Sequence, residues 1–227
     1  MIELKGKHNT AKVFTDNIDQ ETISQVIELL NQPFTADSQI RIMPDCHAGK
    51  GCVVGTTMTL TDKVVPNLVG VDIGCGMLAT KLEETEINLE KLDEVINTQI
   101  PSGFNIHDRA KTDFDGIDKF VVPINIDNAL KSLGTLGGGN HFIEIDEATD
   151  GTKYLVIHSG SRNLGKQVAE YYQNLAIKLN YNSKIPEDLC HLSGNYLNDY
   201  LHDVNVCQLF ALRNRVNNRL TKSINSL

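Results

Sequence analysis

The sequence predicts a mixed α/β fold in which central β-sheets are flanked by helices. Short apolar or alternating runs, which are typical of strands, lie at residues 39–43, 53–60, 68–73, 77–82 and 154–157. Longer segments with apolar residues at helical spacing lie at residues 19–31, 88–99, 164–179 and 196–224. The sequence has no internal repeat, low-complexity tract or flexible linker. We therefore expect a single domain over residues 1–227.

Composition and charge narrow the function classes. The chain is 41% hydrophobic and 22% charged, which excludes wholesale disorder. Its formal net charge of -8 argues against binding nucleic acid over the whole surface but leaves a local basic groove open. The N-terminus does not resemble a signal peptide, and no apolar run is long enough to span a membrane. The chain has five cysteines, and their spacing matches no disulfide framework. We therefore expect a cytoplasmic protein with reduced thiols.

Local signals define most element ends. Residues 1–18 are expected to be irregular or to form short strands. Asp19 and Asn88 are helix-capping residues, and a proline follows each of the helices that they begin. The strand at 39–43 is expected to end at Pro44, where a glycine-broken loop over residues 43–51 begins. Residues 101–131 carry only weak signals.

The second half of the chain alternates turns and strands before two helices. A glycine-rich turn begins at Leu133 and leads into an alternating strand that ends near Ile145. Asp150 and Gly151 form a hairpin-type pair, and the apolar run at 154–157 predicts a buried strand. Helices are expected to follow at 164–179 and 196–224.

The stretch over residues 70–76 places Asp72 and Cys75 three positions apart among three glycines. A carboxylate oxygen and a thiolate sulfur that converge make half of a divalent metal site. For an isolated pair, a capping Asp and a buried structural Cys would be the better interpretation. The glycines favour the metal site, because they cost backbone entropy unless the loop needs unusual torsions.

Two histidines supply the matching donors. His141 follows a run of glycines, and His158 ends the strand at 154–157. Together with Asp72 and Cys75 they offer one oxygen, one sulfur and two nitrogen ligands. This set suits zinc by ligand softness, or manganese or iron if water and phosphate oxygens complete the coordination. A thiolate can also bridge two metal ions.

Further polar residues suit an oxyanion. Arg162 stands in a Ser-Gly-Ser-Arg turn that opens a helix, where backbone N–H groups and a guanidinium can bind a phosphate. Asp45, His47 and Lys50 form a second polar cluster between glycines. Taken alone, this second cluster is better interpreted as a plain loop.

Two glycine-rich motifs resemble nucleotide-binding patterns but lack a required part, and one alternative activity stays open. Residues 74–79 fit the G-x-G-x-x-A pattern, but a strand follows where a dinucleotide site needs a helix. Residues 137–139 could hold phosphate, yet no Gly-Lys-Ser/Thr follows them. A cysteine hydrolase, with Cys75 as nucleophile and His141 or His158 as base, remains open.

Four blocks in order carry a resemblance to a known family. MPDCHAGKG (43–51), GVDIGCGM (70–77), GTLGGGNHFIEI (134–145) and IHSGSRNLG (157–165) resemble the RtcB family of RNA ligases. ALRNR (211–215) is similar to the family's next element. The resemblance implies the fold of that family and the joining of an RNA 3′-phosphate or 2′,3′-cyclic phosphate to a 5′-hydroxyl. It also implies GTP and manganese as cofactors, RNA ends as partners, and a role in RNA repair or tRNA splicing.

The resemblance also implies residue roles. The implied metal ligands are Asp72, Cys75, His141 and His158, with Cys75 bridging two Mn²⁺ ions and Zn²⁺ as the alternative metal. The implied GTP-binding residues are Asn140, His141, Phe142, Ile143 and Glu144, with Asn140 near the phosphate and Glu144 near the guanine. Arg162, Asp45 and His47 fall on positions near the RNA end or the metal centre.

The sequence also departs from the family. Ala48 and Asn163 stand where many members have a bulky residue and a glycine, which suggests a divergent, shorter branch. The family's guanylylated histidine and its third metal-binding histidine follow the ALRNR-like helix, and no residue here matches them. We therefore expect the N-terminal portion of the family fold, which binds Mn²⁺ or Zn²⁺ without forming a GMP adduct. A non-catalytic module that binds metal or RNA ends is the further alternative.

Overall fold

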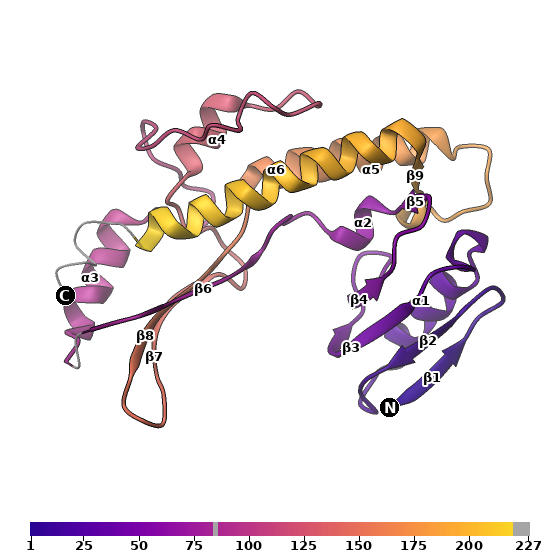
Figure 1. Cartoon of the computed structure of the whole chain (residues 1–227), viewed down its shortest axis with the longest axis horizontal. Coiled ribbons are helices and arrows are strands. Elements are labelled where there is room, and N and C mark those ends of the chain that lie inside the picture. The colour runs from indigo at the N-terminus through magenta and orange to yellow at the C-terminus, as the bar shows by residue number, and fades with distance from the viewer. Residues whose placement is uncertain (84–85, 220–227) are drawn as a thin grey trace. The chain divides into compact units, whose positions relative to one another are not determined.

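The computed structural model describes residues 1–83 and 86–219, which form two compact units. The first unit contains residues 1–70 and 169–200, and the second contains the described residues of 71–168 and 201–219. Each is described separately below (Figure 1). Sheets and helices occur in both, which confirms the predicted mixed α/β class. Within the described residues, no helix combines the length and the apolar character that crossing a membrane requires.

The first unit is built on a four-stranded sheet. Its strands, in spatial order, are β1 (Ile2–Lys5), β2 (Thr10–Val13), β3 (Ile40–His47) and β4 (Val54–Met58). The β2–β3 pair is parallel and the other two pairs are antiparallel. Helix α1 (Gln20–Leu30) and the short helix η1 (Pro33–Thr35) connect the parallel strands. As predicted, Asp19 caps α1, because its carboxylate accepts the Thr22 N–H at 2.8 Å.

Two strand predictions in this unit need correction. Strand β3 continues through Pro44 to His47, where a loop was expected. The register with β4 shifts between Ile42 and His47, so Pro44 lies where the ladder is irregular and its missing N–H breaks no regular pair. The strand expected at 68–73 does not form. Pro66 instead opens helix α2 (Pro66–Val69), since proline suits the first helical turn, and Gly70 ends it with a φ of 88°.

Smaller elements complete the first unit. A two-stranded sheet pairs β5 (Lys63–Val64) with β9 (Leu192–Ser193), and η2 (Glu187–Leu189) precedes β9. The core of the four-stranded sheet contains apolar residues of the sheet, of α1 and of η2, among them Val13, Leu30, Ile40, Ile42 and Leu189.

The second unit carries a three-stranded antiparallel sheet. In spatial order its strands are β6 (Gly76–Lys81), β8 (Lys153–Ser159) and β7 (Phe142–Glu147). The central position of β8 explains its predicted buried run. Helix α3 (Leu89–Gln99), capped by Asn88 as predicted, packs on this sheet through Leu92 and Val95. Helix α4 (Ile126–Ser132) was missed, because its seven residues carry too few apolar positions for a periodic signal.

Two long helices each contribute to both units. Helix α5 (Arg162–Leu179) and helix α6 (Gly194–Arg219) agree with the helices expected at 164–179 and 196–224. The expected end of the second helix at residue 224 lies outside the described residues.

Candidate metal centre

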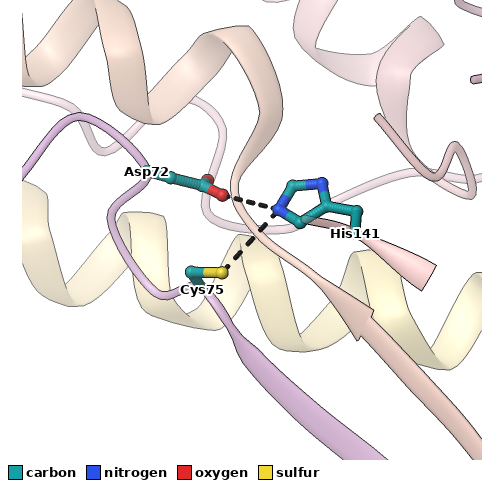
Figure 2. A group of neighbouring side chains, drawn as sticks. All are labelled: Asp72, Cys75 and His141. Carbon is teal, nitrogen blue, oxygen red and sulfur yellow. Dashed lines mark hydrogen bonds and ion pairs between the residues drawn. The ribbon is translucent and has the colours of Figure 1, made fainter. Parts of the chain in front are cut away.

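The turn before β6 aims Asp72 and Cys75 at the same point (Figure 2). The Cys75 N–H donates to the Asp72 carbonyl at 3.0 Å, which closes the turn around buried Ile73. Gly74 has a φ of 80°, and a Cβ there would lie 2.9 Å from the Gln208 Cα on α6. Glycine is therefore required at this position both for its torsion and for the close approach.

His141 completes a group of three ligand-type side chains. Its Nε2 lies 2.8 Å from Asp72 Oδ2 and 3.7 Å from Cys75 Sγ. The three ligand atoms all lie within 4.8 Å of one another (Figure 2). The structure thus brings together a carboxylate, a thiol and an imidazole from two glycine-flanked turns.

The tautomer of neutral His141 leaves its Nε2 lone pair available to a cation in this group. His141 Nδ1 lies 2.9 Å from the Leu136 carbonyl, which can only accept, so Nδ1 is the protonated nitrogen. In the neutral ring Nε2 is then unprotonated, and its lone pair faces the Asp72 carboxylate. Two acceptors at 2.8 Å require a proton or a metal ion between them. The donor set and the oriented imidazole fit a divalent metal.

His158 adjoins the same group through Cys75. It lies on β8, where it pairs with Met77 of β6 and Phe142 of β7. Its Nε2 is 3.0 Å from Cys75 Sγ, and its ring centroid is 5.5 Å from that of His141. Cys75 Sγ therefore lies between two imidazoles.

The electrostatics at Cys75 bear on its chemistry. Partial burial and the negative charge of Asp72 raise the pKa of the Cys75 thiol to about 11. The positive charge of Arg215 acts in the opposite direction and is too weak to reverse the shift. Without a cation the thiol stays protonated at neutral pH, so a metal that binds here must displace a proton.

Arg162 lies beside this group in a strained conformation. It opens α5 with a φ of 57°, the only positive φ among the non-glycine residues that the structure describes. Its Nε donates to Thr135 Oγ1 at 2.9 Å, and its Nη2 donates to the Gly103 carbonyl at 2.8 Å. Burial lowers the pKa of the guanidinium, and Asp72 partly offsets that shift. Arg162, Asp72 and His141 line one cavity of about 650 Å³.

The residues expected at a GTP site lead into and along β7. Asn140 is exposed directly before the strand, and Glu144 is exposed on it. Phe142 packs its ring against His158, with the centroids 5.2 Å apart. Ile143 is partly buried against the core under α3. Their role in binding GTP stays a prediction.

Asp45 and His47 lie in the other compact unit, at the end of β3. Both are exposed, and His47 Nδ1 donates to the Asp45 carbonyl at 3.0 Å. Their role near an RNA end or the metal centre also stays a prediction.

Two residues of α6 that had no predicted role, Asn214 and Arg215, support the site through hydrogen bonds. Asn214 Oδ1 accepts the Gly134 N–H at 2.7 Å and the Thr135 N–H at 3.2 Å, and its Nδ2 donates to the Gly160 carbonyl at 3.2 Å. Arg215 Nη1 donates to the Gly74 and Ser159 carbonyls at 2.9 and 2.6 Å.

These contacts make α6 a common support for three turns, those around Gly74, Gly134 and Gly160. The sequence held a signal for this role, because Asn214 and Arg215 lie three and four residues after Ala211 on the apolar stripe. Polar residues in buried helical positions must find hydrogen-bond partners.

The structure defines an α/β protein with a candidate metal site, and comparisons with known proteins identify its family. The family profile described as tRNA-splicing ligase RtcB matches residues 25–125 and 118–225. The chain belongs to the RtcB family.

Curated relatives agree with this assignment. RNA-splicing ligase RtcB of Escherichia coli K12 is 33% identical over 230 aligned positions, which cover 87% of this chain and 55% of the relative. The tRNA-splicing ligase RtcB of Methanococcus maripaludis is 28% identical, with 76% and 48% covered. RNA-splicing ligase RtcB homolog 1 of Entamoeba dispar is 29% identical, with 76% and 44% covered. The chain thus spans about half the length of these relatives.

Proposed function

We propose that this chain serves RNA ligation of the RtcB type. The reaction joins an RNA 3′-phosphate or 2′,3′-cyclic phosphate to a 5′-hydroxyl, with GTP and manganese as cofactors. The observation that carries the proposal is the group of Asp72, Cys75 and His141 at turns of an RtcB family member. The names of the relatives, which are RNA-splicing and tRNA-splicing ligases, support the same activity.

Each part of the site has a role in this proposal. Asp72, Cys75 and His141, with His158 beside the thiol, would hold Mn²⁺, or Zn²⁺ as the alternative. The bound metal would offset negative charge on phosphate groups. Arg162 would orient a phosphate oxygen, because its side chain is fixed by two hydrogen bonds at the cavity wall. Asn140 to Glu144 would contact GTP, and Asp45 and His47 would approach the RNA end.

Binding of RNA ends tests this proposal on the chain itself. We expect a short RNA with a 3′-phosphate to bind in the presence of Mn²⁺, and the same RNA with a 3′-hydroxyl to bind more weakly. Fluorescence anisotropy of end-labelled RNA measures both affinities. Asp72→Asn should remove the Mn²⁺ dependence, because it removes an anionic ligand. Equal affinity for the two RNAs, with or without Mn²⁺, would contradict the proposal.

A ligation assay then separates an enzyme from a module that only binds. The assay combines a 2′,3′-cyclic-phosphate RNA, a 5′-hydroxyl RNA, Mn²⁺ and GTP. Joined product that is absent with Asp72→Asn supports ligation by the chain. RNA-end binding without joined product favours the binding module, the alternative that the sequence left open.

The cysteine hydrolase has one observation in its favour and one against it. Cys75 Sγ and His158 Nε2 are 3.0 Å apart, as in a nucleophile–base pair. However, a cysteine nucleophile needs a lowered pKa, and burial and Asp72 raise the pKa of Cys75 to about 11. Iodoacetamide labelling of Cys75 distinguishes the two. A metal site predicts that Mn²⁺ protects the thiol and that a chelator restores its labelling, whereas fast labelling regardless of metal favours the hydrolase.

A further inference from the structure

The cavity beside the metal centre has two chemically different walls. Asp72, His141 and Arg162 form the polar wall, and Phe104 and Ile106 contribute apolar surface. Its volume of about 650 Å³ lies within the usual range for a small-molecule site. A ligand that fills it would have one charged end and one apolar, flat end.

Phe104 is the unusual member of this cavity. Its relative exposure is 106%, the highest among the large apolar residues that the structure describes as exposed. Phenylalanine side chains are usually buried in folded proteins. An aromatic ring that is fully exposed to water at a cavity therefore indicates a surface that a ligand covers.

The loop that carries Phe104 is held in place. The Gly103 N–H donates to the Gly137 carbonyl at 2.8 Å, and the Gly103 carbonyl accepts from Arg162 Nη2 at 2.8 Å. On the other side of Phe104, the Asn105 N–H donates to the Ser102 carbonyl at 3.1 Å. Phe104 is therefore a ring on an anchored turn, and the guanidinium of Arg162 ties that turn to the polar wall.

The charges at the polar wall select an anionic group. Arg162 offers a cation there, and Lys166 also lines the cavity. Within the described residues, Arg162 Nη1 has no hydrogen-bond partner, so it remains able to donate to a ligand. The metal centre at Asp72 and His141 would add positive charge on the same side.

We propose that this cavity binds the terminal nucleotide of an RNA 3′-phosphate end, with its base stacked on Phe104 and its phosphate at Arg162. The inference rests on the proposed function and adds the residue that contacts the base. Unpaired RNA bases commonly stack on aromatic side chains, and such stacking tolerates any base. An aromatic contact of this kind would bind the terminal nucleotide without selecting its base.

A tryptophan at this position makes the stacking visible. The natural sequence contains no Trp, so Phe104→Trp places a single indole at the cavity. We expect a short 3′-phosphorylated RNA to quench its fluorescence, because a stacked base quenches indole. The same RNA with an abasic terminal residue should not quench it. Tyr181→Trp is the control, since that position is 83% exposed and lies outside the cavity.

Equal responses of Phe104→Trp to the two RNAs would overturn the proposal. Quenching by GTP and not by RNA would overturn it as well, because the cavity would then belong to the guanine nucleotide.

Affinities separate the failure of this inference from the failure of the proposed function. Phe104→Ala should weaken binding of the base-bearing RNA by about tenfold and leave the abasic RNA unchanged. Phe104→Tyr should restore the affinity. If Phe104→Ala binds 3′-phosphate RNA as well as the natural chain does, stacking is wrong while the proposed function stands. If neither protein prefers a 3′-phosphate, both fail.

Discussion

At the scale of single residues, the candidate metal centre is defined by three ligand-type atoms that lie within 4.8 Å of one another. His141 Nε2, Asp72 Oδ2 and Cys75 Sγ face one another, and the Leu136 carbonyl holds the only ring proton of neutral His141. Asp72 is also held from behind, because its Oδ1 accepts the Ser161 N–H at 3.0 Å. Side chains fixed in this way are preorganised for a cation, which would lower the cost of binding it.

The affinity for a divalent metal should depend on pH. Because the pKa of the Cys75 thiol is raised to about 11, the metal-free chain carries a proton that the ion must displace. Affinity for Mn²⁺ or Zn²⁺ should therefore rise by about tenfold per pH unit above neutrality, the value for release of one proton. Calorimetric titrations at several pH values measure the slope. A flat profile would mean that the thiol is not a ligand.

Gly160 should be essential to the position of Asp72. A Cβ at Gly160 would overlap the Asp72 carboxylate. We expect Gly160→Ala to weaken metal binding by about ten- to a hundredfold, as changes that disturb a ligand's support do. Gly151→Ala is the control, because Gly151 has a φ of 83° and no neighbouring atom within 4 Å of an added Cβ. It should lower stability through strain and leave metal affinity intact.

At the scale of elements, the site depends on turns at strand ends and on the helix that supports them. Asp72 and Cys75 precede β6, His141 precedes β7, and His158 lies near the end of β8. Because β8 runs antiparallel to β6 and β7, the starts of β6 and β7 lie beside the end of β8, at the same end of the sheet. Helix α6 then fixes the turns through Asn214 and Arg215.

Removing the Asn214 amide should loosen the site and the fold together. Asn214→Ala would leave the buried N–H groups of Gly134 and Thr135 without their acceptor. Each such group costs about 1–3 kcal/mol, so the free energy of unfolding should fall by about 2–6 kcal/mol. Denaturant titration measures the loss, and metal titration should show weaker binding. Exposed Arg213 on the same helix is the control, and an equal effect of Arg213→Ala would contradict a specific role for Asn214.

Sequence patterns predicted those elements that carry their own local signals. Capping residues and apolar spacing predicted α1 and α3, and strict alternation or continuous apolar runs predicted β6, β7 and β8. The strand expected at 68–73 was wrong because Pro66, two positions earlier, favours a helix start. The short helix α4 was not predicted, because its seven residues complete only about two turns and give no periodic apolar pattern.

At the scale of the whole molecule, the sequence could supply the ligand types of the site but not its supports. Glycine flanks and strand ends pointed to Asp72, Cys75 and the two histidines. The contacts of Asn214 with turns 54 and 80 positions away depend on tertiary packing, which no local pattern encodes. The exposure of Phe104 likewise became visible only with the cavity.

Each compact unit contains a buried or partly buried histidine that should make the protein sensitive to acid. Burial lowers the pKa of His107 in the second unit and of His191 in the first. The unfolded chain then binds more protons than the folded one, so stability should fall as pH drops below the ordinary histidine pKa of about 6.5. Urea unfolding at pH 7.5 and 5.5 measures the loss, which should shrink in His107→Gln. Identical unfolding curves at the two pH values would contradict this account.

The central claim is that Asp72, Cys75 and His141, with His158, form a metal centre. Titration with Co²⁺ tests it most directly, because a cysteine thiolate bound to Co²⁺ gives a charge-transfer band in the near ultraviolet. We predict that the natural chain develops this band at stoichiometric Co²⁺. Adding Mn²⁺ or Zn²⁺ should displace Co²⁺ and remove the band. Cys75→Ser should bind Co²⁺ more weakly and without the band. A natural chain that shows no band, or a Cys75→Ser chain that keeps it, would contradict the claim.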